Sequence, residues 1–84
     1  MSIPERILAV ADIFEALTAS DRPYKKAKPV SEAISILHKM VLANHVDRDC
    51  FELFLTEEVY LRYANEFLPK DQIDHVDASQ YLVS

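Results

Sequence analysis

The fold is decided in residues 3–26, which read IPERILAVADIFEALTASDRPYKK. Between residues 7 and 19 only Asp12, Glu15 and Thr18 are polar. A helix that is apolar around most of its circumference normally lies inside a folded domain. Asp12 and Glu15 are three residues apart and therefore share one face of such a helix. This acidic stripe is either the solvated edge of a core helix or the place where the chain carries its chemistry.

The rest of the chain indicates an all-α domain, or part of one. Its 84 residues leave room for a single core. The composition, 50% hydrophobic and 27% charged, is typical of a folding chain and not of a disordered one. The sequence contains no glycine, which excludes glycine-rich phosphate loops, dinucleotide-binding fingerprints and type I′ hairpins. Helices must then end at Pro, Asn, Ser or Asp.

Four to five helices are predicted, forming a small bundle. The first runs from Pro4 to about Ser20, and the second begins around Ser31 and ends near Asn44, which suits a left-handed stop. A third helix is expected after a cap at Asp47 or Asp49. A fourth is expected after Thr56, Glu57 and Glu58, and Pro69 ends it. A capping box from Asp77 to Gln80 predicts a short terminal helix that carries Tyr81 and Leu82. The apolar residues expected along the three middle helices are Ala33, Ile34, Leu37, Met40, Val41, Phe51, Phe54, Leu55, Val59, Tyr60, Tyr63, Ala64 and Phe67.

Charge and cysteine content narrow the function classes. The net charge of −5 argues against DNA binding, because the affinity for duplex DNA comes mainly from basic residues that neutralise phosphates. The single cysteine excludes an internal disulfide and suits a reducing compartment. No apolar run of about 18 residues is present, so no membrane association is expected. These features predict a cytoplasmic protein.

Periodicity alone leaves two interpretations of the acidic stripe open. A pair of acids on a helix is usually a solvated face, and the basic run from Arg22 to Lys28 is usually a solvated loop. The alternative is a metal-binding or acid–base carboxylate, because hard divalent cations bind carboxylate oxygens and an apolar helix holds such a ligand rigidly.

A family resemblance favours the second interpretation. Residues 6–37, RILAVADIFEALTASDRPYKKAKPVSEAISIL, resemble the segment that follows the signature motif of HD-GYP proteins, bacterial metal-dependent phosphohydrolases that cleave cyclic di-GMP in signal transduction. FELFL at 51–55, VYLRYANEFL at 59–68 and QIDHVDASQYL at 72–82 resemble the C-terminal tail of many members. The chain contains neither a His-Asp dipeptide nor Gly-Tyr-Pro. We therefore expect residues 1–84 to be the C-terminal part of an HD-like domain about twice as long, with a helical tail over about 56–84.

The resemblance implies roles for four residues. Asp12 matches the last metal ligand of the family, and Glu15 stands where members often have a second acid that supports this ligand or positions water. Arg22 and Lys25 match basic residues that face the substrate phosphates, which suits the forked guanidinium and the ammonium. The metal in the intact domain is expected to be divalent iron or manganese.

The chain alone is expected to bind no metal stably and to lack phosphodiesterase activity, so no residue is assigned as catalytic in isolation. His38, His45 and His75 are given no metal-ligand role, and Cys50 is expected to be a small buried hydrophobic residue with no catalytic role. The partner in the intact domain would be a cyclic dinucleotide. The alternative, from a different class, is a non-catalytic helical interaction module that forms a homodimer through its first helix.

Overall fold

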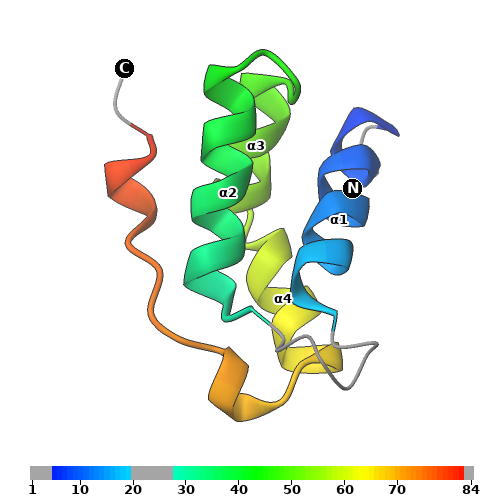
Figure 1. Ribbon diagram of the computed structural model, residues 1–84, viewed down its shortest axis with the longest axis vertical. Helices are drawn as coiled ribbons and strands as arrows, with labels where there is room; N and C mark the ends of the chain where they lie inside the picture. Colours follow the sequence, from blue (N-terminus) through cyan, green and yellow to red (C-terminus); the bar gives the residue numbers. More distant parts are fainter. Residues whose placement is uncertain (1–4, 20–27, 83–84) are drawn as a thin grey trace.

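The computed structural model describes residues 5–19 and 28–82 (Figure 1). Its four α-helices are α1 (Glu5–Thr18), α2 (Val30–Leu42), α3 (Arg48–Thr56) and α4 (Val59–Phe67). Two short 3₁₀ turns follow, η1 (Lys70–Gln72) and η2 (Ala78–Gln80). No strand occurs in these described ranges. The predicted all-α bundle is confirmed.

One apolar core lies between α1, α2 and α3, and α4 closes its lower end in Figure 1. Phe14 of α1 and Phe54 of α3 are fully buried and meet edge to face, with ring centroids 5.3 Å apart. The other core residues are Ile7, Val10, Val30, Ala33, Ile34, Leu37, Val41, Val46, Cys50, Phe51, Leu55, Tyr60 and Ala64. The core expected from the 3–4 spacing is therefore largely confirmed. Met40, Val59 and Tyr63 are only partly buried, and Phe67 is exposed.

Several helix ends follow the predicted cues. Asn44 adopts the left-handed conformation, with φ 64°, directly after α2. The carboxylate of Asp47 caps α3 by accepting from the backbone N–H of Asp49 at 2.9 Å. This pairing satisfies one of the N–H groups that the first turn of a helix leaves without an intrahelical partner.

Two predicted caps are confirmed only in part. The predicted stretch precedes α4, but Thr56 is the last residue of α3, and the N-cap of α4 is Glu58, whose φ of 55° gives the tight turn from which α4 starts at Val59. Asp77 accepts from the N–H and hydroxyl of Ser79, as in a turn, and the chain then forms only a 3₁₀ turn. Tyr81 and Leu82 follow this turn and do not lie on a terminal helix.

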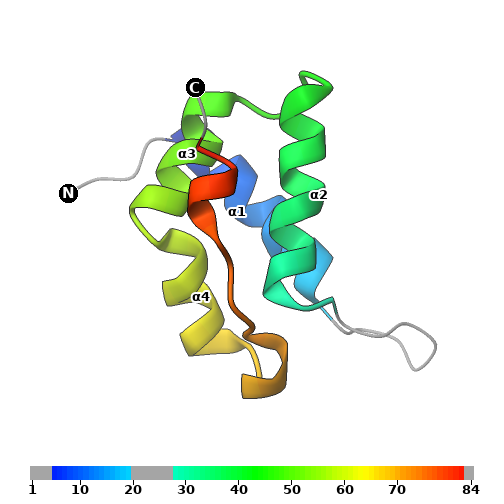
Figure 2. The ribbon, with the colours of Figure 1, turned by 90° about the vertical axis from the view of Figure 1, so that its left-hand side faces the viewer.

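The C-terminal tail, residues 69–82, packs back along α2 (Figures 1 and 2). Asp74 accepts from both the backbone N–H and the hydroxyl of Ser31 in the first turn of α2. At the far end, the Tyr81 ring lies 5.0 Å from the ring of His38 and 6.0 Å from that of Phe51. The tail is thus an integral part of this fold.

Candidate functional site

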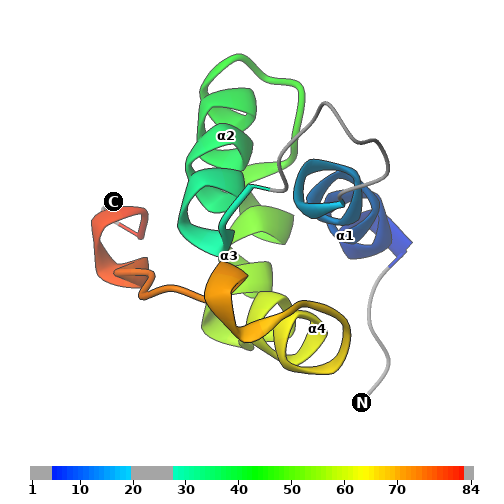
Figure 3. The same cartoon turned by 60° about the horizontal axis from the view of Figure 1, so that its bottom comes forward.

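The candidate site is the exposed face of α1. Ile7, Val10, Phe14 and Thr18 turn the other face of α1 into the core. The exposed face, which we call the open face, consists of Leu8, Ala9, Asp12, Glu15 and Ala16. Leu8 retains 52% of its accessible surface. Figure 3 shows α1 at one side of the bundle, and all five residues of this face are exposed. The predicted sharing of one face by Asp12 and Glu15 is confirmed.

Asp12 lies near the middle of the open face and is exposed. Its carboxylate can offer hard oxygen ligands to a divalent cation. Within the described ranges, no group of three or more His, Cys, Asp or Glu side chains could hold a metal ion. Since divalent metals in proteins take several ligands, these residues fit one part of a metal site and not a complete one.

Glu15 has a defined neighbour on α4. The Tyr63 hydroxyl donates to Glu15 Oε2 at 3.4 Å. The pKa of Tyr63 is raised, first by burial, then by the negative charge of Glu15 and by this hydrogen bond. Tyr63 packs edge to face on Phe14, 5.7 Å between centroids, and lies 4.9 Å from the ring of Phe67. The sequence analysis assigned Tyr63 and Phe67 only to the core; their i, i+4 spacing was the one signal that they form a pair.

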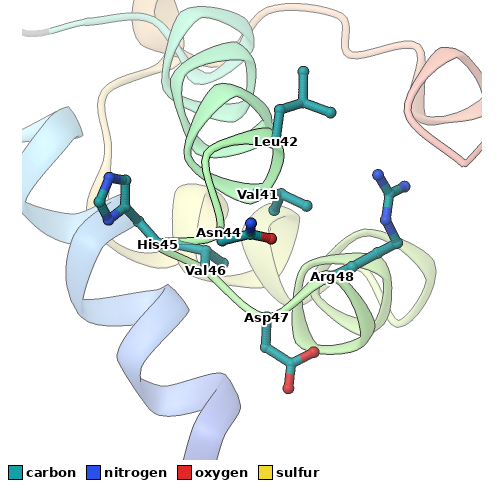
Figure 4. A pocket seen from close by; sticks show the side chains of 7 residues that line it. All are labelled: Val41, Leu42, Asn44, His45, Val46, Asp47 and Arg48. Atoms are coloured by element: carbon teal, nitrogen blue, oxygen red, sulfur yellow. The ribbon is translucent and has the colours of Figure 1, made fainter.

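The other flank of α1 borders a small hollow beside the α2–α3 loop. Ala9, Val10 and Ile13 line it from α1, and His45, Val46 and Asp47 from the loop, around a volume of about 170 Å³. A wider hollow of about 530 Å³ adjoins it, lined by residues 41, 42 and 44–48 (Figure 4). In Figure 4 the His45 ring points toward α1 and the Arg48 side chain points away from it. Both hollows are open to solvent and hold no buried charged group.

The basic residues predicted to face phosphates, Arg22 and Lys25, lie outside the described residues. Thr18 and Lys28, at the two ends of their segment, are described, and one side chain forms hydrogen bonds to both. Gln72 Nε2 donates to the carbonyl of Thr18 at 2.9 Å and to that of Lys28 at 2.8 Å. Gln72 is buried in this position. Sequence reasoning missed it, because its partners are 54 and 44 residues away along the chain.

The remaining candidates are packed or peripheral. Cys50 is buried, as predicted. His38 is half-buried between the rings of Phe51 and Tyr81, and His75 is exposed in the tail. No helix in the described part of the chain has the length and apolar character needed to cross a membrane.

Comparison with known proteins matches a family and two relatives. The family model described as HD domain matches residues 1–50. The 3′3′-cGAMP-specific phosphodiesterase 3 of Vibrio cholerae serotype O1 is 41% identical over 51 residues, which are 61% of this chain and 11% of that protein. The 3′3′-cGAMP-specific phosphodiesterase 1 of the same organism is 33% identical over 55 residues, 66% of this chain and 12% of that protein. No solved structure gave a significant match.

Proposed function

This chain belongs to the HD domain family, and from that premise we propose that it is the C-terminal part of a metal-dependent phosphodiesterase domain that hydrolyses a cyclic dinucleotide in bacterial signalling. Both relatives are phosphodiesterases specific for 3′3′-cGAMP, which supports a substrate of this class. Cyclic di-GMP, which the HD-GYP resemblance implies, and 3′3′-cGAMP are the two candidates.

The observation that carries the proposal is the position of Asp12. An apolar helix with its inner face locked in the core holds this carboxylate at the middle of its open face. A rigid element positions a metal ligand more precisely than a loop does. Asp12 would be one ligand of a divalent iron or manganese, with Glu15 beside it holding the ligand or a water in place. Bound metal would supply an activated water and stabilise charge on the phosphoryl oxygens.

Arg22 and Lys25 complete the proposed site on the substrate side. A guanidinium can form two parallel hydrogen bonds to a phosphate, and an ammonium neutralises charge that develops on phosphoryl oxygens. Gln72 supports this assignment indirectly, because it fixes the residues that flank their segment. Asp12 and Glu15 are too few to hold a catalytic metal, so the chain alone is proposed to be inactive and to bind no metal stably.

The test is a chimera. Residues 1–50 of this chain would replace the corresponding residues of the Vibrio cholerae phosphodiesterase 3, which supplies the rest of a domain. We expect the chimera to hydrolyse 3′3′-cGAMP when manganese is present, and the 84-residue chain to show no turnover under the same conditions. A folded but inactive chimera would contradict the proposal, and turnover by the isolated chain that disappears in Asp12→Ala would contradict its inactivity.

A second candidate is a non-catalytic module that dimerises through α1. The exposure of Leu8 with the small residues Ala9 and Ala16 favours it. Burying about 400 Å² of apolar surface per chain contributes on the order of 10 kcal/mol before the association and ordering costs that offset much of it. Asp12 and Glu15 would then lie at the rim, since burying an unpaired charge costs several kcal/mol.

Dimerisation is tested by analytical ultracentrifugation over a range of concentrations. We expect the native chain to associate as its concentration rises and Leu8→Glu to remain monomeric. Leu42→Glu is the matched control, because Leu42 is also exposed, 61%, but lies on α2. A native chain that stays monomeric throughout, or equal weakening by both substitutions, would exclude pairing through α1.

A further inference from the structure

An aromatic pair reaches the surface beside the open face. Phe67, the last residue of α4, keeps 64% of its accessible surface, more than any other exposed large hydrophobic residue in the described part of the chain. Its ring lies 4.9 Å from Tyr63, with 42° between the ring planes. Tyr63 rests on the fully buried ring of Phe14. The three rings form a path from the core to solvent, so the outermost ring stands on a fixed support.

The carboxylate of Glu15, a hydrogen-bond acceptor, lies beside Tyr63, the more buried residue of this pair. Glu15 is exposed, and its Oε2 receives the Tyr63 hydroxyl at 3.4 Å. A carboxylate has about four acceptor sites, so one donor leaves capacity for others. Tyr63 thus orients the carboxylate next to the aromatic surface without using up its acceptors.

The combination suits one kind of ligand. Every nucleobase has a π face that stacks on aromatic side chains, with affinity contributed by each stacked base. Guanine also presents two adjacent N–H donors on its Watson–Crick edge, which match the two oxygens of a carboxylate, whereas adenine presents an acceptor beside its amino group. An aromatic surface with an adjacent carboxylate therefore selects guanine over adenine.

The position agrees with the proposed phosphodiester site. Glu15 is one turn from Asp12 on the same face of α1, where side chains three residues apart are about 5–6 Å apart. The net charge of −5 disfavours binding through the phosphates alone, so contacts to the base would have to contribute.

We propose that Glu15, Tyr63 and Phe67 form a binding site for the guanine base of a cyclic dinucleotide, an inference that rests on the proposed function above. Tyr63 and Phe67 supply the stacking surface. Glu15 accepts from the two guanine N–H groups, a role that replaces the support of the metal ligand or water considered for it above. The site explains how one chain could act on either candidate substrate, because cyclic di-GMP and 3′3′-cGAMP both contain guanine.

The test is an NMR titration of the 84-residue chain with cyclic di-GMP, 3′3′-cGAMP and cyclic di-AMP. We expect shift changes at Glu15, Tyr63 and Phe67, and binding of the two guanine-containing ligands at least about tenfold tighter than of cyclic di-AMP. Phe67→Ala should weaken all binding by at least about fivefold. Glu15→Gln should reduce the preference for guanine and leave the weaker binding of cyclic di-AMP unchanged.

Leu53→Ala is the matched control, since Leu53 is an exposed apolar residue on α3, away from the aromatic pair. Equal affinity for the three ligands, no detectable binding, or an unchanged affinity in Phe67→Ala would overturn the inference. These results are separate from the chimera test. An active chimera with no guanine preference in the chain refutes only this site, and guanine-dependent binding with an inactive chimera refutes only the proposed function.

Discussion

Gln72 is the buried polar residue on which the α1–α2 connection depends. Its amide joins two carbonyls, of Thr18 and Lys28, that lie on either side of the basic segment. Gln72→Leu keeps the approximate volume but removes both hydrogen bonds. Because a buried carbonyl without a partner costs about 1–3 kcal/mol, we expect the free energy of unfolding to fall by about 2–3 kcal/mol.

Urea denaturation followed by circular dichroism measures this loss. Gln80→Leu serves as the control, because Gln80 is exposed in the same tail and should change stability by less than about 0.5 kcal/mol. Equal stability of the two variants would show that the Gln72 hydrogen bonds contribute nothing to the fold.

Tyr60 makes the stability of the domain sensitive to alkaline pH. Burial, and secondly the charge of Glu58, raise its pKa above the ordinary value of 10.0. The folded chain therefore holds the phenolic proton more tightly than the unfolded chain. The resulting stability is fully present below pH 10.0 and is lost as the pH rises through the higher folded pKa.

The expected result is a steeper fall of the free energy of unfolding above pH 10.0 in the native chain than in Tyr60→Phe. At neutral pH the two stability curves should run parallel, since the phenol is then neutral in both states. Urea titrations at a series of pH values test this, and parallel curves on the alkaline side would refute the linkage.

At the level of single residues, the sequence was sufficient to predict features that depend on one helix alone. The spacing of Asp12 and Glu15 predicted their common face, and the buried position of Cys50 followed from its small apolar side chain. The partners of Glu15 and Gln72 could not be predicted. Tyr63 is 48 residues from Glu15, and nothing in a local pattern indicates which distant turn will pack beside it.

Among the elements, α2 obtains its N-terminal cap from elsewhere in the chain. Pro29 occupies its N-cap position and makes no side-chain cap hydrogen bond. Asp74 supplies the missing acceptor to Ser31 from 43 residues away, and its negative charge also lies at the favourable end of the helix dipole. The start of α2 is therefore coupled to the packing of the tail.

Asp74→Ala should lower the free energy of unfolding by about 1–2 kcal/mol, the usual cost of losing an N-cap. Asp71→Ala is the comparison, because it removes a neighbouring exposed acid that makes no such cap. Thermal denaturation of the two variants gives the difference. A loss of the same size in both would mean that general charge, and not the cap, stabilises this junction.

Element boundaries were predictable where a side chain bonds to its own turn. Asn44 and Asp47 act within two residues of their own position; Asn44 was predicted, and Asp47 was one of the two predicted candidates for its cap. The start of α4 was predicted after the stretch from Thr56 to Glu58, but its capping residue was not, because the turn depends on the backbone of Glu58 in a left-handed conformation that acidic side chains adopt only occasionally. The predicted terminal helix does not form, because Asp77 bonds to Ser79 and closes a turn without committing the chain to a helix.

For the whole molecule, the all-α class followed from composition, since a chain without glycine has few ways to make tight hairpins. How the tail packs could not be predicted, because it depends on Gln72, Asp74 and Tyr81 each meeting a residue far away in the chain. In the proposed site, too, some residues could be predicted from a local pattern and others depended on distant packing. Asp12 was proposed from the pattern of one helix together with the family resemblance, whereas the aromatic pair beside Glu15 required the packing of α4 on α1.

The central claim is that Asp12 is a metal ligand of an HD-type phosphodiesterase site, and the most direct test is the turnover number of the chimera with Vibrio cholerae phosphodiesterase 3. We expect Asp12→Asn to lower kcat for 3′3′-cGAMP by more than about 100-fold, since even residues that only support a metal ligand typically contribute 10–100-fold. Asp49→Asn, the same change at another exposed aspartate within residues 1–50, should leave kcat within about twofold. A folded Asp12→Asn chimera that turns over as fast as its parent would contradict the account.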